Sequence, residues 1–200
     1  GNVSLVSAGE TDEERYQQLV DMIRYASRQR FQVGVHSTGD RAIDSVVDGF
    51  VRALEEDPWD ARHYVIHGEY TSPECAKRLA THNLGVSSNS LVKRQIAETS
   101  IGLVGKEMAD YGWPHKTLIK AGVHLANASD APIMPPDWKM GIEAMITRES
   151  LASALVSGPE ERLNRKEAIR AHTIEGAWLD HADHLKGSLE VGKFADFIVL

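Results

Sequence analysis

The sequence has little cysteine and no long apolar run, and both shortages exclude classes of protein. Cys75 is the one cysteine among 200 residues, so the chain forms no internal disulfide and no zinc site of the Cys-x-x-Cys type. No apolar run approaches the roughly 20 residues that a membrane-spanning helix needs. Residues Gly1–Leu5 lack the basic start and long apolar core of a secretory signal peptide. We therefore expect a protein of the reducing cytoplasm with no membrane partner.

An excess of basic residues is also lacking. Lys and Arg total 22 against 29 Asp and Glu, which gives a net charge of −7. This balance disfavours binding to a nucleic-acid backbone or to an anionic membrane surface. No glycine-rich phosphate loop follows the first predicted strand, which argues against an open, flavodoxin-like sheet.

What the sequence does contain is a regular alternation of short apolar runs and helical patterns. Hydrophobic residues make up 42% and charged residues 26%, which is typical of a globular protein. Such an alternation indicates β–α units and a parallel sheet. Strands are predicted over 31–36, 63–67, 84–88 and 123–128, and the tail, 187–200, is predicted to be a turn followed by a strand. Helices are predicted over 12–30, 42–55, 73–81, 116–120, 138–156 and 165–179.

The predicted sheet is small for a parallel one. Four central strands leave two unprotected edges, and the tail strand is still running at Leu200. We interpret the sequence as part of something longer. On its own, the chain should pair through its sheet edges, either as a homo-oligomer or with a missing N-terminal segment of the same protein.

The number of histidines, nine, is the one unusual feature of the composition, and two of these histidines end predicted strands. His36 closes the first strand, His67 closes the second, and Asp130 follows the fourth. In a parallel α/β fold, ligand groups lie at the carboxyl ends of the strands. Two imidazoles and a carboxylate suit a catalytic zinc that keeps a position open for water. Taken singly, each is more often a hydrogen-bonded structural residue or a turn former.

Two further features can be interpreted either as part of a functional site or as ordinary structural residues. His63 lies four residues before His67 and would share its strand face, but it is expected to pack or to form a local hydrogen bond. The aromatic loop Tyr111–Pro114 either lines the mouth of a pocket or packs against a neighbouring loop.

Four segments match motifs of one known family in order and spacing. They are His36–Asp44, Arg62–His67, Ala121–Pro132 and Gly187–Leu200. The first three resemble the signatures that follow barrel strands five, six and eight of the amidohydrolase superfamily, in its YtcJ-like branch (amidohydrolase family 3). The fourth resembles the return of the chain from the barrel to a small β-sandwich.

The resemblance implies a fold and a site. The fold class is α/β: residues 1–184 would form strands five to eight of a (β/α)8 TIM barrel with their helices, and residues 185–200 the start of the β-sandwich. His36 and His67 would be metal ligands, and Asp130 both a ligand and the proton shuttle. The expected metal is zinc, with iron or manganese as alternatives.

The chain also departs from the family pattern. The His-x-His pair of strand one and the lysine of strand four would lie upstream of Gly1. Where the branch has Glu-His-Ala-Gln, this chain has Ile66-His67-Gly68-Glu69, and Asn89 and Ser90 replace a glutamine and a proline. These positions bear on substrate contacts.

The resulting hypothesis is a metal-dependent amidohydrolase that cleaves a carbon–nitrogen bond of the amide type in a small molecule. Asp130 would act as general base towards a metal-activated water and then as general acid. The alternative is a non-catalytic α/β binding or regulatory module that retains the scaffold, since fold does not imply function. A His-x-His pair upstream in the full protein would favour the enzyme.

Overall fold

The computed structural model describes residues 9–199. The prediction about Gly1–Leu5 therefore lies outside the described residues. The strands are β1 (Gly34–Ser37), β2 (Tyr64–His67), β3 (Gly85–Ser88) and β4 (His124–Asn127). The helices are α1 (Asp12–Arg28), α2 (Asp40–Glu56), α3 (Pro73–Thr81), α4 (Ser90–Val104), α5 (Lys106–Tyr111), α6 (His115–Ala121), α7 (Trp138–Thr147), α8 (Arg165–Ala171) and α9 (Ile174–Leu179), with a short 3-10 helix, η1 (Pro159–Glu161).

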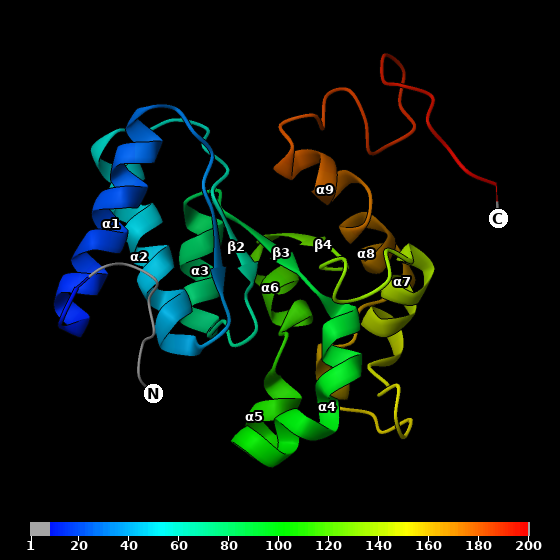
Figure 1. Cartoon of the computed structure of the whole chain (residues 1–200). Coiled ribbons are helices and arrows are strands. Elements are labelled where there is room, and N and C mark those ends of the chain that lie inside the picture. Colours follow the sequence, from blue (N-terminus) through cyan, green and yellow to red (C-terminus); the bar gives the residue numbers. More distant parts are fainter. Residues whose placement is uncertain (1–8, 200) are drawn as a thin grey trace.

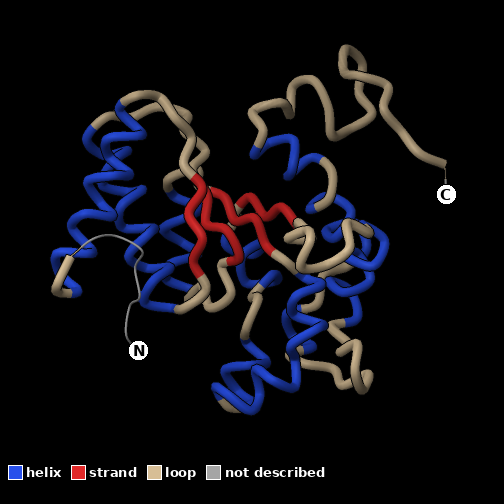
Figure 2. The backbone as a smooth tube through the Cα atoms, viewed as in Figure 1, coloured by secondary structure: helices blue, strands red, loops and turns tan. Residues whose placement is uncertain are grey.

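The four strands form one parallel sheet in the order β1-β2-β3-β4. Figure 1 shows α2, α3 and α6 packed beside the sheet, and Figure 2 shows the strands in the middle of the molecule with helices around them. Each strand is followed by at least one helix before the next strand begins. Strands that follow one another in sequence and in space, with helices between them, are the building units of a β/α barrel. The predicted parallel α/β class is confirmed.

The main core lies between the sheet and these helices. Val65, Val86 and Leu125 occupy one row of the register and are at most 1% exposed. They pack in one cluster with the apolar stripes of α2 and α3, including Phe50 and Leu79. Because successive side chains on a strand point to opposite faces, the neighbouring row faces away from these helices. That row contains His36, Ile66, Ser87 and Ala126.

Local sequence signals place the helix starts well. Thr11 accepts a hydrogen bond from the backbone N–H of Glu14 and completes a capping box, and Asn164 does the same with Glu167. Ser72 caps α3. These boundaries depend on neighbours within four residues, which is why the sequence predicts them.

Tertiary contacts override the sequence in the second half of the chain. The predicted helix 138–156 is wrong beyond Thr147, because Arg148 adopts a left-handed backbone with φ of 53°. Its guanidinium donates to the carbonyls of Asp110, Gly112, Trp113 and Ser157, so the chain turns to let the side chain enter the interior. The predicted helix 165–179 is two helices, because the chain breaks at His172 and Thr173 between α8 and α9.

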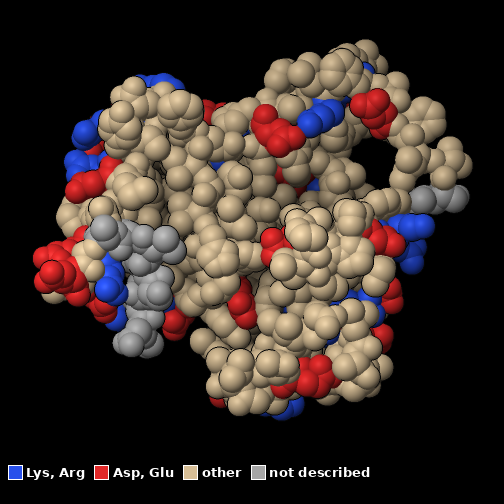
Figure 3. Space-filling model, in the orientation of Figure 1, with Lys and Arg blue, Asp and Glu red and all other residues tan. Residues whose placement is uncertain are grey.

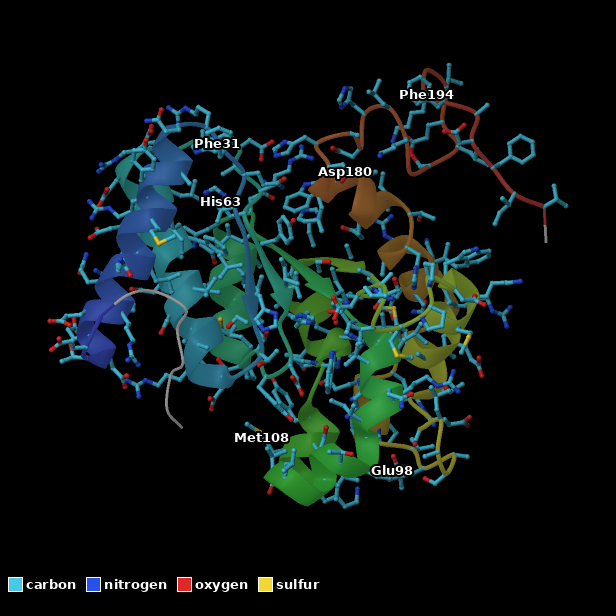
Figure 4. The ribbon with its side chains drawn as sticks, viewed as in Figure 1. Phe31, His63, Glu98, Met108, Asp180 and Phe194 are labelled. Carbon is cyan, nitrogen blue, oxygen red and sulfur yellow. The ribbon has the colours of Figure 1, made fainter. Side chains whose placement is uncertain are left out.

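Two further differences concern the loop after β3 and the tail. Helices α4 and α5 were not predicted; α4 has a mixed surface in which even Lys93 and Arg94 are buried, so its apolar stripe is weak. The tail, 187–200, contains the predicted turn, but the strand predicted to follow it is absent from the described residues, which continue to residue 199 as coil. Figure 4 shows Phe194 on this coil, away from the sheet. A strand needs a neighbour for its backbone hydrogen bonds, and the described residues supply none there.

The composition bears on two further features, the cysteine and the length of the apolar helices. Cys75 lies in the first turn of α3 and is 1% exposed, and burial, followed by the nearby Asp44, raises the pKa of its thiol. No helix within residues 9–199 is both long and apolar enough to cross a bilayer.

Candidate metal centre

His36 and His67 meet at the carboxyl ends of β1 and β2. Their ring centroids are 4.6 Å apart, and the ring planes cross at 82°. The register alone would separate them, because His36 pairs with Ile66 whereas His67 pairs with Ser37. His67, however, has a φ of 73°, so the extended backbone ends there and its imidazole turns towards His36. The two histidines converge as their places at the strand ends suggest, while their role as ligands stays a prediction.

Asp130 lies in the loop that follows β4. The backbone N–H of Ala128 donates to the carbonyl of Ser88 over 2.7 Å, and that of Ile133 donates to the carbonyl of Asp130 over 2.8 Å. Asp130 has a φ of 60°, which aspartate tolerates better than most residues. Burial and the charge of His36 lower the pKa of His67, and the carboxylate of Asp130 opposes this shift. The third predicted residue is therefore within electrostatic reach of the histidine pair.

These three side chains fit a divalent cation by their chemistry. A lowered pKa keeps the imidazole of His67 neutral near pH 7, which is the form that binds metals. Two imidazoles with a carboxylate are a donor set that suits zinc. Among residues 9–199, however, no three His, Cys, Asp or Glu side chains lie close enough to hold an ion together. The structure thus brings two of the predicted ligands into contact and leaves Asp130 outside a closed three-ligand cluster.

Two buried polar residues at the same edge of the sheet are absent from the predicted site. Ser37 and Asn89 are each 2% exposed, and within the described part of the chain the Oγ of Ser37 and the Oδ1 of Asn89 have no hydrogen-bond partner. Ser37 is the last residue of β1 and Asn89 directly follows β3, so the rule that selects His36 also selects their positions. Their side chains are common in turns, and the sequence gives no further signal that separates them from turn formers.

Glu69, two residues after His67, is partly buried and contacts the aromatic loop at Trp113. Burial raises the pKa of Glu69 to about 7, against the lowering effects of Tyr70 and Lys93. The backbone carbonyl of Glu69 accepts a hydrogen bond from the N–H of Trp113 over 2.7 Å. Trp113 is 2% exposed. For the aromatic loop, packing is therefore the correct alternative at Trp113.

His63 has a structural environment. Its Nδ1 accepts a hydrogen bond from the backbone N–H of Val33 over 3.0 Å, and its ring packs between Phe50 and Trp59. Burial lowers the pKa of His63 to about 4. Figure 4 shows it on the same side of the molecule as Phe31, and it directly precedes the amino end of β2, whereas His67 is the last residue of that strand. The expectation of local packing and hydrogen bonding is confirmed.

The face of the molecule seen in Figure 3 carries few charged side chains over its middle, and acidic and basic groups gather towards its periphery. Electrostatic steering by a strongly charged central patch is thus not a feature of this face. Recognition at the strand ends would depend on the individual polar groups described above.

Comparison with known proteins identifies the family. Residues 4–200 match the family model described as "Amidohydrolase family". The chain is similar to "Putative amidohydrolase YtcJ" of Bacillus subtilis (strain 168), with 31% identity over 185 residues, covering 90% of this chain and 34% of that protein. It is also similar to the N-substituted formamide deformylase of Arthrobacter pascens, with 25% identity over 181 residues, covering 90% of this chain and 33% of that protein.

A solved structure gives the same result at the level of the fold. The crystal structure of an uncharacterized metal-dependent hydrolase from Pyrococcus furiosus matches with a TM-score of 0.72 and 25% identity, covering 90% of this chain and 35% of that one. The chain thus spans about a third of the length of the relatives that it matches. This partial coverage agrees with the predicted fold, the C-terminal half of a TIM barrel. By the family match over nearly its whole length, the chain belongs to the amidohydrolase family.

Proposed function

We propose that this chain supplies the C-terminal half of the active site of a metal-dependent hydrolase that cleaves a carbon–nitrogen bond of the amide type in a small molecule. The single observation that carries the proposal is the contact between the His36 and His67 rings, 4.6 Å apart at the carboxyl ends of adjacent strands, in a chain of the amidohydrolase family. The named activity of the Arthrobacter pascens relative, deformylation of N-substituted formamides, makes such amides the first substrates to test.

The roles of the residues follow from their chemistry. His36 and His67 would hold the cation through neutral ring nitrogens, and the Asp130 carboxylate would complete the set. When bound, such a cation acts as a Lewis acid on water and on a carbonyl oxygen. Asp130 is the one acidic group of the set, so its Oδ atoms would accept the proton that water loses and return it to the leaving amine. Zinc suits these donors best, with iron and manganese as alternatives.

The second candidate function is a binding or regulatory module that kept the scaffold without the chemistry. It is favoured by one observation: within residues 9–199 the acidic and imidazole side chains form no closed three-ligand group. Ile66, in place of an acidic residue before His67, points the same way, because it removes a carboxylate from the immediate surroundings of that histidine.

Metal content distinguishes the two functions. The purified chain would be loaded with zinc, passed through a desalting column and measured by elemental analysis. We expect about one zinc per chain, lost in His36→Ala and in His67→Ala. His184→Ala is the matched control, because His184 is exposed and stands outside the predicted set. Zinc bound equally by all four proteins, or by none, would contradict the proposed site and favour the binding module.

Hydrolysis is tested separately on an N-substituted formamide, by following release of the free amine in the zinc-loaded protein. Asp130→Asn keeps the size of the side chain and removes its basicity, so we expect it to lower the rate by about 100-fold or more. An unchanged rate in this variant would exclude Asp130 as the proton shuttle.

A further inference from the structure

A cavity of about 550 Å³ lies between α7 and α8, which Figure 1 shows side by side. None of the three candidate metal ligands lines it. Most of its wall is apolar and comes from α7, α8 and the tail: Trp138, Ile142, Ile146, Ile169 and Ile198. A cavity of this size and character is typical of a site for a small organic molecule.

The two helices run in opposite directions along the cavity. The N–H of Leu163, just before α8, donates to the carbonyl of Met145, near the end of α7, over 3.0 Å. At the other end, a Cβ on Gly141 would lie 2.7 Å from Cε1 of His172, the residue that follows α8. The first half of α7 therefore lies beside the end of α8, and the end of α7 lies beside the start of α8.

Two basic side chains line the cavity at its opposite ends. Lys139 is the second residue of α7, and Arg165 is the first residue of α8. Along α7, the step from Lys139 to Ile146, at the end where α8 begins, is about 10 Å long. Neither basic side chain forms an ion pair or a hydrogen bond with any of residues 9–199, and no acidic side chain from this part of the sequence lines the cavity.

The other polar groups of the wall already have partners. The Oγ1 of Thr173 donates to the carbonyl of Ile169 over 2.8 Å, and the Nδ2 of Asn127 donates to the Nε2 of His172 over 3.1 Å. Burial lowers the pKa of His172, so its ring is neutral near pH 7. The cavity thus presents apolar surface along its length and an unpaired positive charge at each end.

We infer that this cavity is a binding site for a linear dicarboxylate of medium length, whose carboxylates pair with Lys139 and Arg165 and whose methylene chain lies against the apolar wall. Burial of the chain supplies the hydrophobic contribution, and the guanidinium matches the planar geometry of a carboxylate. A fatty acid with one carboxylate would leave one of the two cations unpaired. The inference does not depend on the proposed function, because the candidate metal ligands lie outside the cavity.

The ligand class is tested with three compounds of equal length: decanedioate, decanoate and the uncharged ten-carbon diol. Binding would be measured by isothermal titration calorimetry at neutral pH and low ionic strength, because salt screens exposed ion pairs. We expect a dissociation constant of about 1 mM or lower for decanedioate. Decanoate should bind about 2- to 5-fold more weakly, and the diol more weakly again, because each exposed ion pair contributes modestly.

Two results with these compounds would overturn the inference. One is an affinity for decanoate or for the diol that equals or exceeds that for decanedioate. The other is the absence of saturable binding of decanedioate below about 10 mM.

Substitution of the cations locates the site. Lys139→Met and Arg165→Met should each weaken decanedioate binding by about 2- to 5-fold and abolish its advantage over decanoate. The matched control is Lys166→Met, which removes an exposed charge next to Arg165 and outside the cavity wall, and it should leave the affinity unchanged. The same affinity in Arg165→Met as in Lys166→Met would contradict the inference.

A charge placed on the apolar wall gives a second test. Ile169 is 43% exposed, so Ile169→Asp should keep the fold, checked by circular dichroism, while its carboxylate repels the ligand and weakens binding by about 10-fold or more. The alternative occupants are a second copy of the chain and another polypeptide segment. They predict no heat with decanedioate and a changed sedimentation of Ile169→Asp, and this result would overturn the inference in favour of a protein partner.

Discussion

The replacement of Arg148 by alanine should be among the most destabilising changes in this protein. Arg148 is 2% exposed, and its guanidinium donates to four backbone carbonyls in two segments, those of Asp110, Gly112 and Trp113 in one and that of Ser157 in the other. Three of these bonds, at 2.8, 2.9 and 2.8 Å, are buried. Arginine and alanine are equally strained at φ of 53°, so the backbone contribution cancels and the loss of the bonds dominates.

The expected magnitude follows from the three buried bonds. A net contribution of about 1–1.5 kcal/mol for each lowers the free energy of unfolding by about 3–4.5 kcal/mol. With a urea dependence of about 2 kcal/mol per molar, the urea concentration at the midpoint of unfolding should fall by about 1.5–2.3 M, measured by circular dichroism. The control is Arg162→Ala, which removes one exposed bond, to the carbonyl of Thr147, and should cost less than about 1 kcal/mol. Equal midpoints for the two variants would refute the reasoning.

Three further predictions address titration, backbone geometry and the sheet edges. Burial lowers the pKa of His63 to about 4, below its value of about 6.5 in the unfolded chain, so the unfolded state binds more protons between these two pH values. The free energy of unfolding of the native protein should therefore fall from pH 6.5 to pH 4 more steeply than that of His63→Gln. Parallel pH profiles of the two proteins in urea titrations would contradict this. Gly158→Ala should destabilise the protein by more than about 2 kcal/mol, because its Cβ would lie 1.9 Å from the carbonyl oxygen of Asp110 and its φ is +65°. Gly102→Ala, whose Cβ would lie in open space on α4, should stabilise the protein by about 0.5–1 kcal/mol. Equal thermal midpoints for the two variants would contradict this prediction. The outer edges of β1 and β4 pair with no strand among residues 9–199 and should cause self-association. Sedimentation of a single monomeric species at all concentrations would exclude it.

Much of the fold could be predicted from local pattern. The capping boxes at Thr11 and Asn164 mark helix starts because their hydrogen bonds involve residues three positions apart. The strands follow from short apolar runs between turn residues. The end of α7 could not be predicted, since it depends on where the Arg148 side chain finds its carbonyls, more than 30 residues away in Asp110, Gly112 and Trp113.

The candidate site shows the same division. Position at a strand end selects His36, His67 and Asp130, and the first two do converge. The backbone of His67, however, departs from the strand at φ of 73°, and no residue type signals that departure as glycine would. Asn89 could not be distinguished from an ordinary turn residue, because only the three-dimensional arrangement shows that it is buried and that, among the described residues, its Oδ1 atom has no hydrogen-bond partner.

The buried position of Cys75 makes its thiol a native probe of local unfolding around α3. As the one thiol in the sequence, shielded in α3 and 1% exposed, it can react with a thiol reagent only while the helix is separated from the core. The rate of labelling under native conditions therefore counts excursions to open states, and it does so at one defined position with no engineered probe. A mutation that loosens the packing of α3 against the sheet would be detected as faster labelling before any change in secondary structure is visible.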